Sequence, residues 1–435
     1  MLNKLRFNIF WLLDTVKGGY LRKEMNAVRE ILELKSFNQV QERNKPVLKH
    51  LLDTVVKESK FYESYSGYNS LDDFPVINKF IVKENLDALN LIPSTSSDLL
   101  EVSSSGSTGI PFRVYKTKQK VLRSRADLLY FMNMVGYTIG DQLLFVRLWL
   151  KKYRKNVFML TLQNQRQIEV EEDLKEPNIE EFLKGIQHDQ QPKTILGYVS
   201  GFQQICTHLD NVNSPPLNCN IKTIIATSEL LYPSVRDKME YYFGAPVVSR
   251  YSNEENGIIA QQQINDRAFT INWASFYVEI LHLDEDIPAQ HGELGRIVVT
   301  DYFNFATPLI RYDTGDLGKF CNFEQDNIPK FETITGRIRD ILYNTSGELV
   351  NPSIIYGGVA QFSEITQFQV IQKSKKNYTF KVNVNGEYAN EDELLTFYKS
   401  YLGQDAEIDV EYVNEIPLLS SGKRRIIINE YDPKD

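Results

Sequence analysis

The sequence predicts an α/β protein, with a large layered α/β N-terminal domain followed by a small α+β C-terminal domain. The first reason is length, because 435 residues exceed the size at which a single hydrophobic core stops growing. The second is that strand and helix patterns alternate from residue 100 onward, as in layered sheets. The third is a change after Gly336 to short strands and one helix. We therefore expect two domains, 1–338 and 339–435.

Helices are predicted to open the chain. Residues 7–16 are apolar and follow Lys4 and Arg6, but they are too few to span a bilayer, and no small-residue cleavage site follows them. A packed helix is expected there, with an interfacial amphipathic helix as the alternative. Residues 20–60 continue with helix formers at helical apolar spacing, and short helices are expected around Pro75.

Apolar runs bounded by Gly, Pro, Asn or Asp predict the strands of both domains. In the large domain, strands are expected at 98–102, 111–115, 143–150, 194–198, 223–227 and 246–251, and helices at 200–211 and 233–243. In the small domain, strands are expected at 368–372, 378–384, 407–413 and 426–428, and a helix at 391–402. The first set predicts a layered sheet and the second a compact α+β unit.

Charge and cysteine content exclude several classes of protein. Acidic residues outnumber basic ones by 57 to 49, which argues against nucleic acid as a partner. Cys206, Cys219 and Cys321 have no CxxC spacing, so neither a disulfide framework nor a structural zinc site is expected. We expect a reducing, cytoplasmic environment and no transmembrane segment.

Residues 103–111 read SSSGSTGIP and lie between two predicted strands. Glycines let several backbone N–H groups converge, and the hydroxyls add donors, so the run can form an anion nest. The lysine of a Walker-type loop is absent, and Ile110 follows the last glycine. Taken alone, the loop is either a phosphate nest or a solvated linker.

Four further segments carry groups suited to chemistry, and each also has a purely structural explanation. These are RYSNEENG at 250–257, LIRYDTGDL at 309–317, GRIRDIL at 336–342 and SSGKRR at 420–425. The first puts an aromatic ring and two carboxylates after a strand, where open α/β sheets bind ligands. The structural alternatives are an acidic turn, an ion-paired strand end, a charged linker and a solvated loop.

The order of these five segments resembles that of the adenylate-forming enzymes. More narrowly, it is similar to the phenylacetate–CoA ligase branch and its capsule-biosynthesis relatives of the CapK type. The resemblance spans most of the chain, including DFPVINK at 73–79 and KTILGYVS at 193–200. It implies an N-terminal adenylation domain that binds ATP and a carboxylate, and a mobile C-terminal domain that carries a catalytic lysine.

The resemblance also implies roles for single residues. The phosphate loop corresponds to Ser104, Ser105, Gly106, Ser107, Thr108 and Gly109. Ile110 replaces the usual loop lysine, which should weaken the grip on pyrophosphate but not abolish it. Tyr251, Ser252 and Asn253 match the motif that packs on adenine, Ser228 and Glu229 match the turn along it, and Glu255 matches the glutamate that coordinates Mg²⁺. Glu254 is the alternative metal ligand.

The remaining roles fall near the ribose, the hinge and the acyl group. Asp316 matches the carboxylate that accepts the ribose hydroxyls, and Arg337 the arginine that reaches the same sugar. Arg339 occupies the hinge, and Lys423 matches the lysine that bridges the carboxylate and the α-phosphate. Tyr198 is assigned to the acyl pocket. Lys423 and Glu255 are therefore the implied catalytic residues.

The resemblance implies ATP and Mg²⁺ as cofactors and a small carboxylic acid as substrate. It predicts AMP-forming activation of the acid as an acyl-adenylate and transfer of the acyl group, with CoA the favoured acceptor and co-substrate. One alternative is amide formation with an amine-bearing sugar or glycan precursor in capsule or O-antigen biosynthesis. Another is an adenylyltransferase that leaves AMP on the acceptor, as coenzyme F390 synthetases do. Dimers occur in this branch, so a homodimer is compatible with the resemblance.

Overall fold

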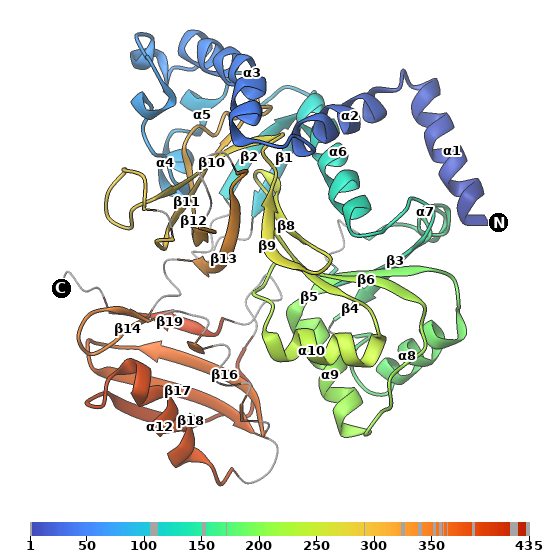
Figure 1. Cartoon of the computed structure of the whole chain (residues 1–435), viewed down its shortest axis with the longest axis vertical. Helices are drawn as coiled ribbons and strands as arrows, with labels where there is room; N and C mark the ends of the chain where they lie inside the picture. The colour runs from blue at the N-terminus through green and yellow to red at the C-terminus, as the bar shows by residue number, and fades with distance from the viewer. Residues whose placement is uncertain are drawn as a thin grey trace.

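The structure is a computed structural model. It describes residues 2–104, 112–149, 154–170, 172–290, 292–322, 327–337, 342–350, 354–355, 359, 361–362, 364–384, 388–417 and 425–431. Figure 1 shows a large body that contains one long sheet covered by helices, and a smaller sheet and helix formed by the C-terminal part of the chain. The predicted fold class is confirmed.

The large body is organised around an eleven-stranded sheet with the order β10-β11-β12-β13-β9-β8-β7-β6-β5-β3-β4. Its strands are β3 (Gln142–Arg147), β4 (Gln165–Glu169), β5 (Lys193–Tyr198), β6 (Ile221–Thr227), β7 (Val247–Asn253), β8 (Gly257–Gln263), β9 (Asp266–Ile271), β10 (Phe276–Leu281), β11 (Gly295–Asp301), β12 (Tyr312–Phe320) and β13 (Lys330–Arg337). In this order, each strand from β10 to β7 is antiparallel to the next. From β7 through β6, β5 and β3 to β4, each strand is parallel to the next. Strand β7 therefore joins an antiparallel half to a parallel half.

The parallel half is buried because its connecting helices pack against it. These helices are α7 (Val157–Gln163), α8 (Asn178–His188), α9 (Val199–Asn211) and α10 (Pro233–Phe243). Every residue of β5 is buried, as expected for a parallel strand between layers. Helices α8, α9 and α10 share one apolar core with the strands, which includes Phe182, Phe202 and Met239. The predicted strands and helices of this half are confirmed, except for the length of the strand predicted at 143–150.

One predicted strand is shorter than expected. Strand β3 ends at Arg147, three residues before the predicted end at residue 150. The backbone N–H of Trp149 donates to the Glu169 carboxylate at 2.8 Å. A side chain thus takes the hydrogen bond that a longer ladder would have supplied, and the chain leaves the sheet.

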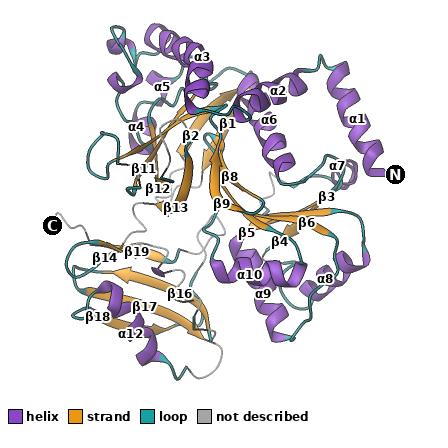
Figure 2. Cartoon of the chain, viewed as in Figure 1, coloured by secondary structure: helices purple, strands orange, loops and turns teal. Residues whose placement is uncertain are grey.

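The antiparallel half is covered by helices from the first third of the chain (Figure 2). These are α2 (Tyr20–Leu32), α3 (Phe37–Glu58), α4 (Lys79–Glu84), α5 (Leu86–Leu89) and α6 (Lys118–Met134), with two short 3₁₀ helices at Glu63–Tyr65 and Leu71–Asp73. Two cores result. In the first, α2 and α6 pack on β8 to β11, and in the second α3, α4 and α5 pack around Phe112 and Tyr312.

The first helix, α1 (Leu2–Val16), forms as predicted, but only one side of it packs against the body. None of its residues is buried, and most of its leucines are more than half exposed. The helix contacts the rest of the chain through Trp11, which packs against the core beneath α2 and α6, and through polar residues, among them Asn3, Arg6 and Asp14. Among the described residues, no helix has both the length and the apolar content needed to cross a bilayer.

The hairpin on either side of the phosphate loop is confirmed as an antiparallel pair. It consists of β1 (Leu99–Ser104) and β2 (Phe112–Thr117), in register from Leu99 opposite Thr117 to Ser104 opposite Phe112. The loop itself, residues 105–111, lies outside the described residues. Its two ends are held side by side by the last pair of the ladder.

The C-terminal part has its own core. A four-stranded sheet with the order β18-β17-β16-β19 packs against a helix, and a two-stranded ladder precedes it. The elements are β14 (Leu342–Tyr343), β15 (Leu349–Val350), β16 (Ile365–Gln372), β17 (Asn377–Val384), α12 (Glu391–Leu402), β18 (Glu407–Tyr412) and β19 (Ile427–Asn429). Phe368, Phe380 and Tyr398 form its aromatic centre. The predicted boundary at 338/339 falls between described ranges and stays a prediction.

Candidate active site

The candidate site lies where β7 ends and the chain turns back into β8. The Asn253 side-chain oxygen accepts a hydrogen bond from the backbone N–H of Asn256 at 2.8 Å, which closes a tight turn. Gly257 has a φ of 107°, a value that L side chains rarely adopt, so glycine suits the point where β8 begins. The turn contains the two carboxylates of Glu254 and Glu255 and points them in different directions. Glu254 is exposed, whereas Glu255 is buried.

Glu255 is the central acid of the site. Its side chain is 2% exposed, and the Tyr312 hydroxyl donates to its Oε1 at 2.8 Å. The Lys79 ammonium lies 3.3 Å from the same oxygen. Burial, and next the Glu255 charge, raise the pKa of Tyr312 well above its usual value, so this phenol remains a hydrogen-bond donor. Glu255 thus has one proton donor and one cation on Oε1.

Lys79 is a site residue that the motifs did not single out. Residues 77–79 run beside β12, because the N–H of Ile77 donates to the Arg311 carbonyl and the Ile77 carbonyl accepts from the Asp313 N–H. Asn78 then caps α4 by accepting from the N–H groups of Phe80 and Ile81. Lys79 is the first helical residue, where a cation opposes the helix dipole. That unfavourable placement is the sequence signal that could have identified it.

A second acid lies near Glu255. The Tyr251 hydroxyl donates to Asp316 Oδ2 at 2.8 Å and lies 3.2 Å from the Thr314 hydroxyl. Burial, followed by the Asp316 charge, raises the pKa of Tyr251 well above its usual value. Asp316 pairs with Arg337 in the β12–β13 ladder. The two residues predicted to bind the ribose are therefore neighbours on adjacent strands.

Three more predicted residues lie at the ends of β5 and β6, close to their helices. Tyr198 ends β5 and is 7% exposed, and the Arg147 guanidinium lies 5.8 Å from its ring centre. Ser228 has a φ of 70°, which is uncommon for serine and typical of a tight turn at a strand end. The Glu229 carboxylate accepts from the backbone N–H and hydroxyl of Ser200. Glu229 therefore caps the start of α9, a role that the sequence did not predict.

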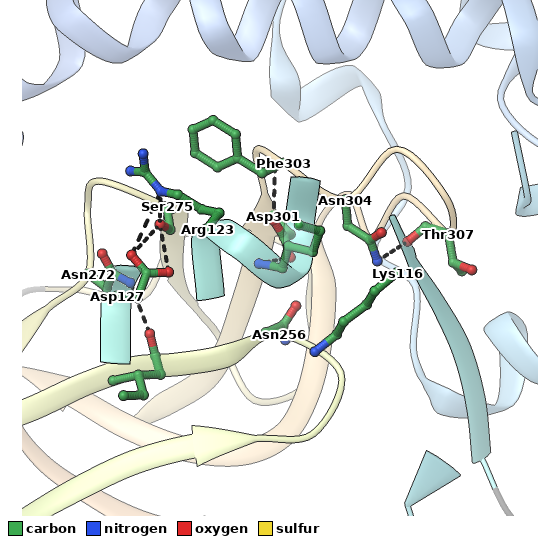
Figure 3. Close-up of polar contacts among 12 residues, drawn as sticks. Lys116, Arg123, Asp127, Asn256, Asn272, Ser275, Asp301, Phe303, Asn304 and Thr307 are labelled. Atoms are coloured by element: carbon green, nitrogen blue, oxygen red, sulfur yellow. Dashed lines mark hydrogen bonds and ion pairs between the residues drawn. The ribbon is translucent and has the colours of Figure 1, made fainter. Parts of the chain in front are cut away.

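Behind the turn lies a cluster of buried charges, shown in Figure 3. The Lys116 ammonium donates to the Glu254 carbonyl at 2.7 Å, which fixes the turn from inside. Burial, and next the charge of Lys120, lower the pKa of Lys116 to about 8. Lys120 and Asp301 are both fully buried and form an ion pair of 2.6 Å.

The same cluster continues along α6. Arg123 donates to the Ser275 hydroxyl at 2.9 Å and to the Ala274 carbonyl at 2.6 Å, and it pairs with Glu24 at 3.1 Å. The Ser275 hydroxyl in turn lies 2.8 Å from the Asp127 carboxylate. We give the name internal charge cluster to the charged residues Glu24, Lys116, Lys120, Arg123, Asp127 and Asp301 together with Ser275. It connects α6 and β2 to the loops next to the site.

Comparison with known proteins relates the chain to CapK and to acid–CoA ligases. A profile of the CapK C-terminal domain matches residues 342–430. Over 446 residues the chain is 24% identical to CapK of Staphylococcus aureus, covering 96% of each protein. It is 23% identical to the phenylacetate-coenzyme A ligase of Aromatoleum evansii, over 55% of this chain and 58% of that one.

Along 96% of its length the chain is similar to CapK, and it has the fold of the adenylate-forming CoA ligases. These similarities indicate an AMP-forming ligase.

Solved structures of the superfamily share the fold. A 2-hydroxyisobutyryl-CoA ligase in the postadenylation state superposes with a TM-score of 0.69 over 90% of each chain, at 18% identity. The same ligase in its thioesterification state gives a TM-score of 0.54. ATP-bound MatB from Rhodopseudomonas palustris gives 0.57, covering 77% of this chain and 68% of that one, at 16% identity.

The residues present fit a magnesium ion of the kind this superfamily uses. Among the described residues, no group of three or more His, Cys, Asp or Glu could hold a metal by itself. Mg²⁺ is commonly held by one or two carboxylates together with substrate phosphates, so Glu255 alone is a sufficient protein ligand. The Tyr312 hydroxyl and the Lys79 ammonium both contact its Oε1.

Several predicted site residues fall outside the described part of the chain. These are Ser105, Gly106, Ser107, Thr108, Gly109 and Ile110 in the loop, the hinge residue Arg339, and Lys423. Of Arg337 and Ser104 only the backbone is described, in β13 and β1. Their roles stay predictions.

Proposed function

We propose that this protein activates a carboxylic acid with Mg·ATP as an acyl-adenylate at the end of β7, and then transfers the acyl group to an acceptor, with CoA favoured. The observation that carries the proposal is the grouping of Glu255, Lys79 and Tyr312 beside the Tyr251–Asp316 pair. These groups can serve a metal-bound triphosphate on one side and a ribose on the other. Similarity to CapK and to the phenylacetate-coenzyme A ligases supports acyl-adenylate chemistry as the class of reaction.

In the first step, a carboxylate oxygen of the acid attacks the α-phosphorus of ATP, and the bond to the β-phosphate oxygen breaks. The products are the mixed anhydride and pyrophosphate. Mg²⁺ on Glu255 would supply a Lewis acid for the phosphate oxygens. Negative charge builds up around the α-phosphorus, and we assign Lys423 to stabilise it there.

Lys79 has a specific part in this proposal. Ile110 replaces the loop lysine of the family, so the β- and γ-phosphates lack that cation. Lys79 is 39% exposed and lies 3.3 Å from the candidate metal ligand. Its ammonium can leave Glu255 for a phosphate oxygen when Mg·ATP binds, which would restore the missing positive charge.

In the second step, the acceptor attacks the acyl carbon and AMP leaves with the former carboxylate oxygen. We propose that the small domain rotates about Arg339 between the steps. The higher TM-score against the postadenylation state than against the thioesterification state of one ligase supports two distinct domain arrangements in this fold.

A second acceptor class is supported by one observation. CapK matches the chain along 96% of its length, whereas the coenzyme A ligases from Escherichia coli (strain K12) and Aromatoleum evansii match 41% and 55% of it. The resemblance to capsule-biosynthesis relatives makes an amine on a sugar or glycan precursor, giving an amide, the alternative to CoA.

The test is acid-dependent exchange of labelled pyrophosphate into ATP. A panel of aryl acids, amino acids, hydroxy acids and uronic acids should contain at least one that stimulates exchange. CoA and amino sugars are then compared as acceptors by release of free AMP. Absence of exchange with every acid contradicts the first step, and AMP retained on the acceptor identifies an adenylyltransferase instead.

A further inference from the structure

Helix α1 presents an apolar stripe to solvent. Six residues form it, with exposed fractions between 39% and 77%: Leu2, Leu5, Ile9, Leu12, Leu13 and Val16. Their spacing places them within an arc of about 100° on one side of an α-helix. The stripe is continuous along the whole helix, so it is the one face of α1 that is apolar along its full length.

The rest of α1 attaches the helix to the body, by the packing of Trp11 on the core and by polar contacts. The Arg6 guanidinium donates to the Thr161 carbonyl of α7 at 3.1 Å, and the Asn3 amide lies 3.4 Å from the Asp141 carboxylate. At the C-terminal end, the Asp14 carboxylate accepts from the backbone N–H groups of Leu21 and Arg22. These contacts hold the apolar stripe outward, which reverses the usual arrangement of a surface helix.

The charge around α1 is opposite to that of the whole protein. Residues 1–23 contain five Lys or Arg residues and one Asp, although the chain carries a net charge of −8. Lys4 and Lys17 are exposed on the two sides of the stripe, whereas Arg22 lies 4.9 Å from the ring centre of Trp11, on the side of α1 that packs against the core. The exposed face therefore combines apolar residues with basic flanks.

A second exposed apolar segment lies next to α1. Figure 1 shows α7 beside it, and the Arg6–Thr161 hydrogen bond joins the two helices. Val157 and Phe158 of α7 are 78% and 74% exposed. Two adjacent helices on one edge of the molecule thus leave large apolar side chains in water.

We infer that α1, with α7 beside it, docks the protein on an anionic phospholipid bilayer, with α1 lying in the interface parallel to the surface. Fifteen residues are too short to cross the hydrocarbon core, and an apolar stripe flanked by Lys and Arg is the pattern of an interfacial helix. Anionic headgroups attract the basic flanks. A second copy packed on the same face would bring two sets of like charges together, which disfavours that occupant. This surface is additional to the proposed activity.

The experiment is flotation of the full chain with vesicles. Vesicles of phosphatidylcholine alone are compared with an equal mixture of phosphatidylcholine and phosphatidylglycerol. The double variant Leu5→Gln/Leu12→Gln removes two side chains of the stripe. Its matched control is Val212→Gln/Ile287→Gln, since those two residues are each 53% exposed and lie elsewhere. All four substituted positions are exposed, so both variants should fold.

The wild type and the control should float with the mixed vesicles. The α1 variant should bind these vesicles with an affinity at least about tenfold lower, because binding strength scales with the apolar area inserted. Binding to phosphatidylcholine alone should be weaker than to the mixture. The proposal is overturned if the wild type does not float or if both double variants float equally. It is overturned too if the wild type binds vesicles of phosphatidylcholine alone as strongly as it binds the mixed vesicles. It is also overturned if light scattering shows a lipid-free dimer that only the α1 variant dissociates. Acid-dependent pyrophosphate exchange in detergent-free solution should be the same in all three proteins.

Discussion

Two groups of charged residues lie side by side in the large domain, and they are arranged differently. In the internal charge cluster, Lys120 and Asp301 are both fully buried and in contact. At the candidate site, buried Glu255 is paired with Lys79, which is 39% exposed. The first pair is enclosed and cannot exchange partners with a ligand. The second has one partner that can move, which is what a site for a charged substrate requires.

The difference separates stability from activity. A buried ion pair whose partners cannot be replaced by water affects folding when it is broken. A pair whose cation faces solvent is exchanged for substrate charge at small cost. We therefore expect substitutions in the internal charge cluster to alter unfolding and substitutions at the site to alter catalysis.

The largest effect is expected from Asp301→Asn. It leaves the Lys120 charge buried without its counter-ion, which should lower the free energy of unfolding by about 3–5 kcal/mol. The double variant Lys120→Met/Asp301→Leu removes both charges and should recover most of this loss. Urea unfolding followed by circular dichroism measures both. Equal destabilisation in the single and double variants would show that the pair is not the source.

The next effect concerns Lys423. Lys423→Ala should slow acyl-adenylate formation by about 10²–10³-fold, because a positioned charge at the α-phosphorus is lost. Acyl transfer from preformed adenylate should remain largely intact. Lys375→Ala, an exposed lysine of the same domain, is the control. Single-turnover measurements separate the two steps, and an equal loss in both would refute the assignment.

Glu255→Gln should weaken the apparent Mg²⁺ affinity by about 10–100-fold, because the amide is a much poorer ligand for a hard cation. Glu254→Gln is the matched control one residue away, and it should have little effect. Magnesium titrations of pyrophosphate exchange measure both variants. A larger effect at Glu254 would transfer the metal role to that residue.

A smaller effect is expected for Lys79. Lys79→Ala should raise the KM for ATP about tenfold, the size expected for a charge-assisted hydrogen bond. Lys83→Ala on the same helix is the control. Ile110→Lys alone should lower the KM for ATP. In the double variant with Lys79→Ala, it should offset the rise in KM that Lys79→Ala causes. An unchanged KM in Ile110→Lys would mean that this side chain points away from the nucleotide.

The smallest effect is a pH dependence of stability from the internal charge cluster. The folded-state pKa of Lys116 is about 8, against an ordinary 10.5. Between these values the unfolded chain binds more protons, so this residue's contribution to the unfolding free energy rises with pH, and below the lower value it is flat. Relative to Lys116→Met, the wild type should gain about 1 kcal/mol between about pH 8 and pH 9. A constant difference across that range would contradict the assignment.

The sequence predicted the fold better than the contacts of the site. Buried parallel strands such as β5 read as apolar runs, so their positions followed from composition. The Tyr251–Asp316 hydrogen bond did not, because three strands separate β7 from β12 in the sheet order. The β9–β13 ladder that lies between them has two residue pairs.

The first helix illustrates the same limit. Its apolar period predicted a helix, but period alone does not say which face meets the protein. The inward side includes Trp11, which packs on the core, and the polar residues Asn3, Arg6 and Asp14. The partners of these three lie on a distant loop, on α7 and on the start of α2. Such a placement depends on tertiary partners that local spacing does not encode.

The most direct test of the account is the fate of the carboxylate oxygens. An acid that supports exchange is labelled in its carboxylate with oxygen-18 and incubated with Mg·ATP and the acceptor. Attack of that oxygen on the α-phosphorus, followed by cleavage of the acyl carbon–oxygen bond, predicts one labelled oxygen in the released AMP and none in pyrophosphate. Unlabelled AMP, or AMP bound to the acceptor, would contradict an acyl-adenylate intermediate.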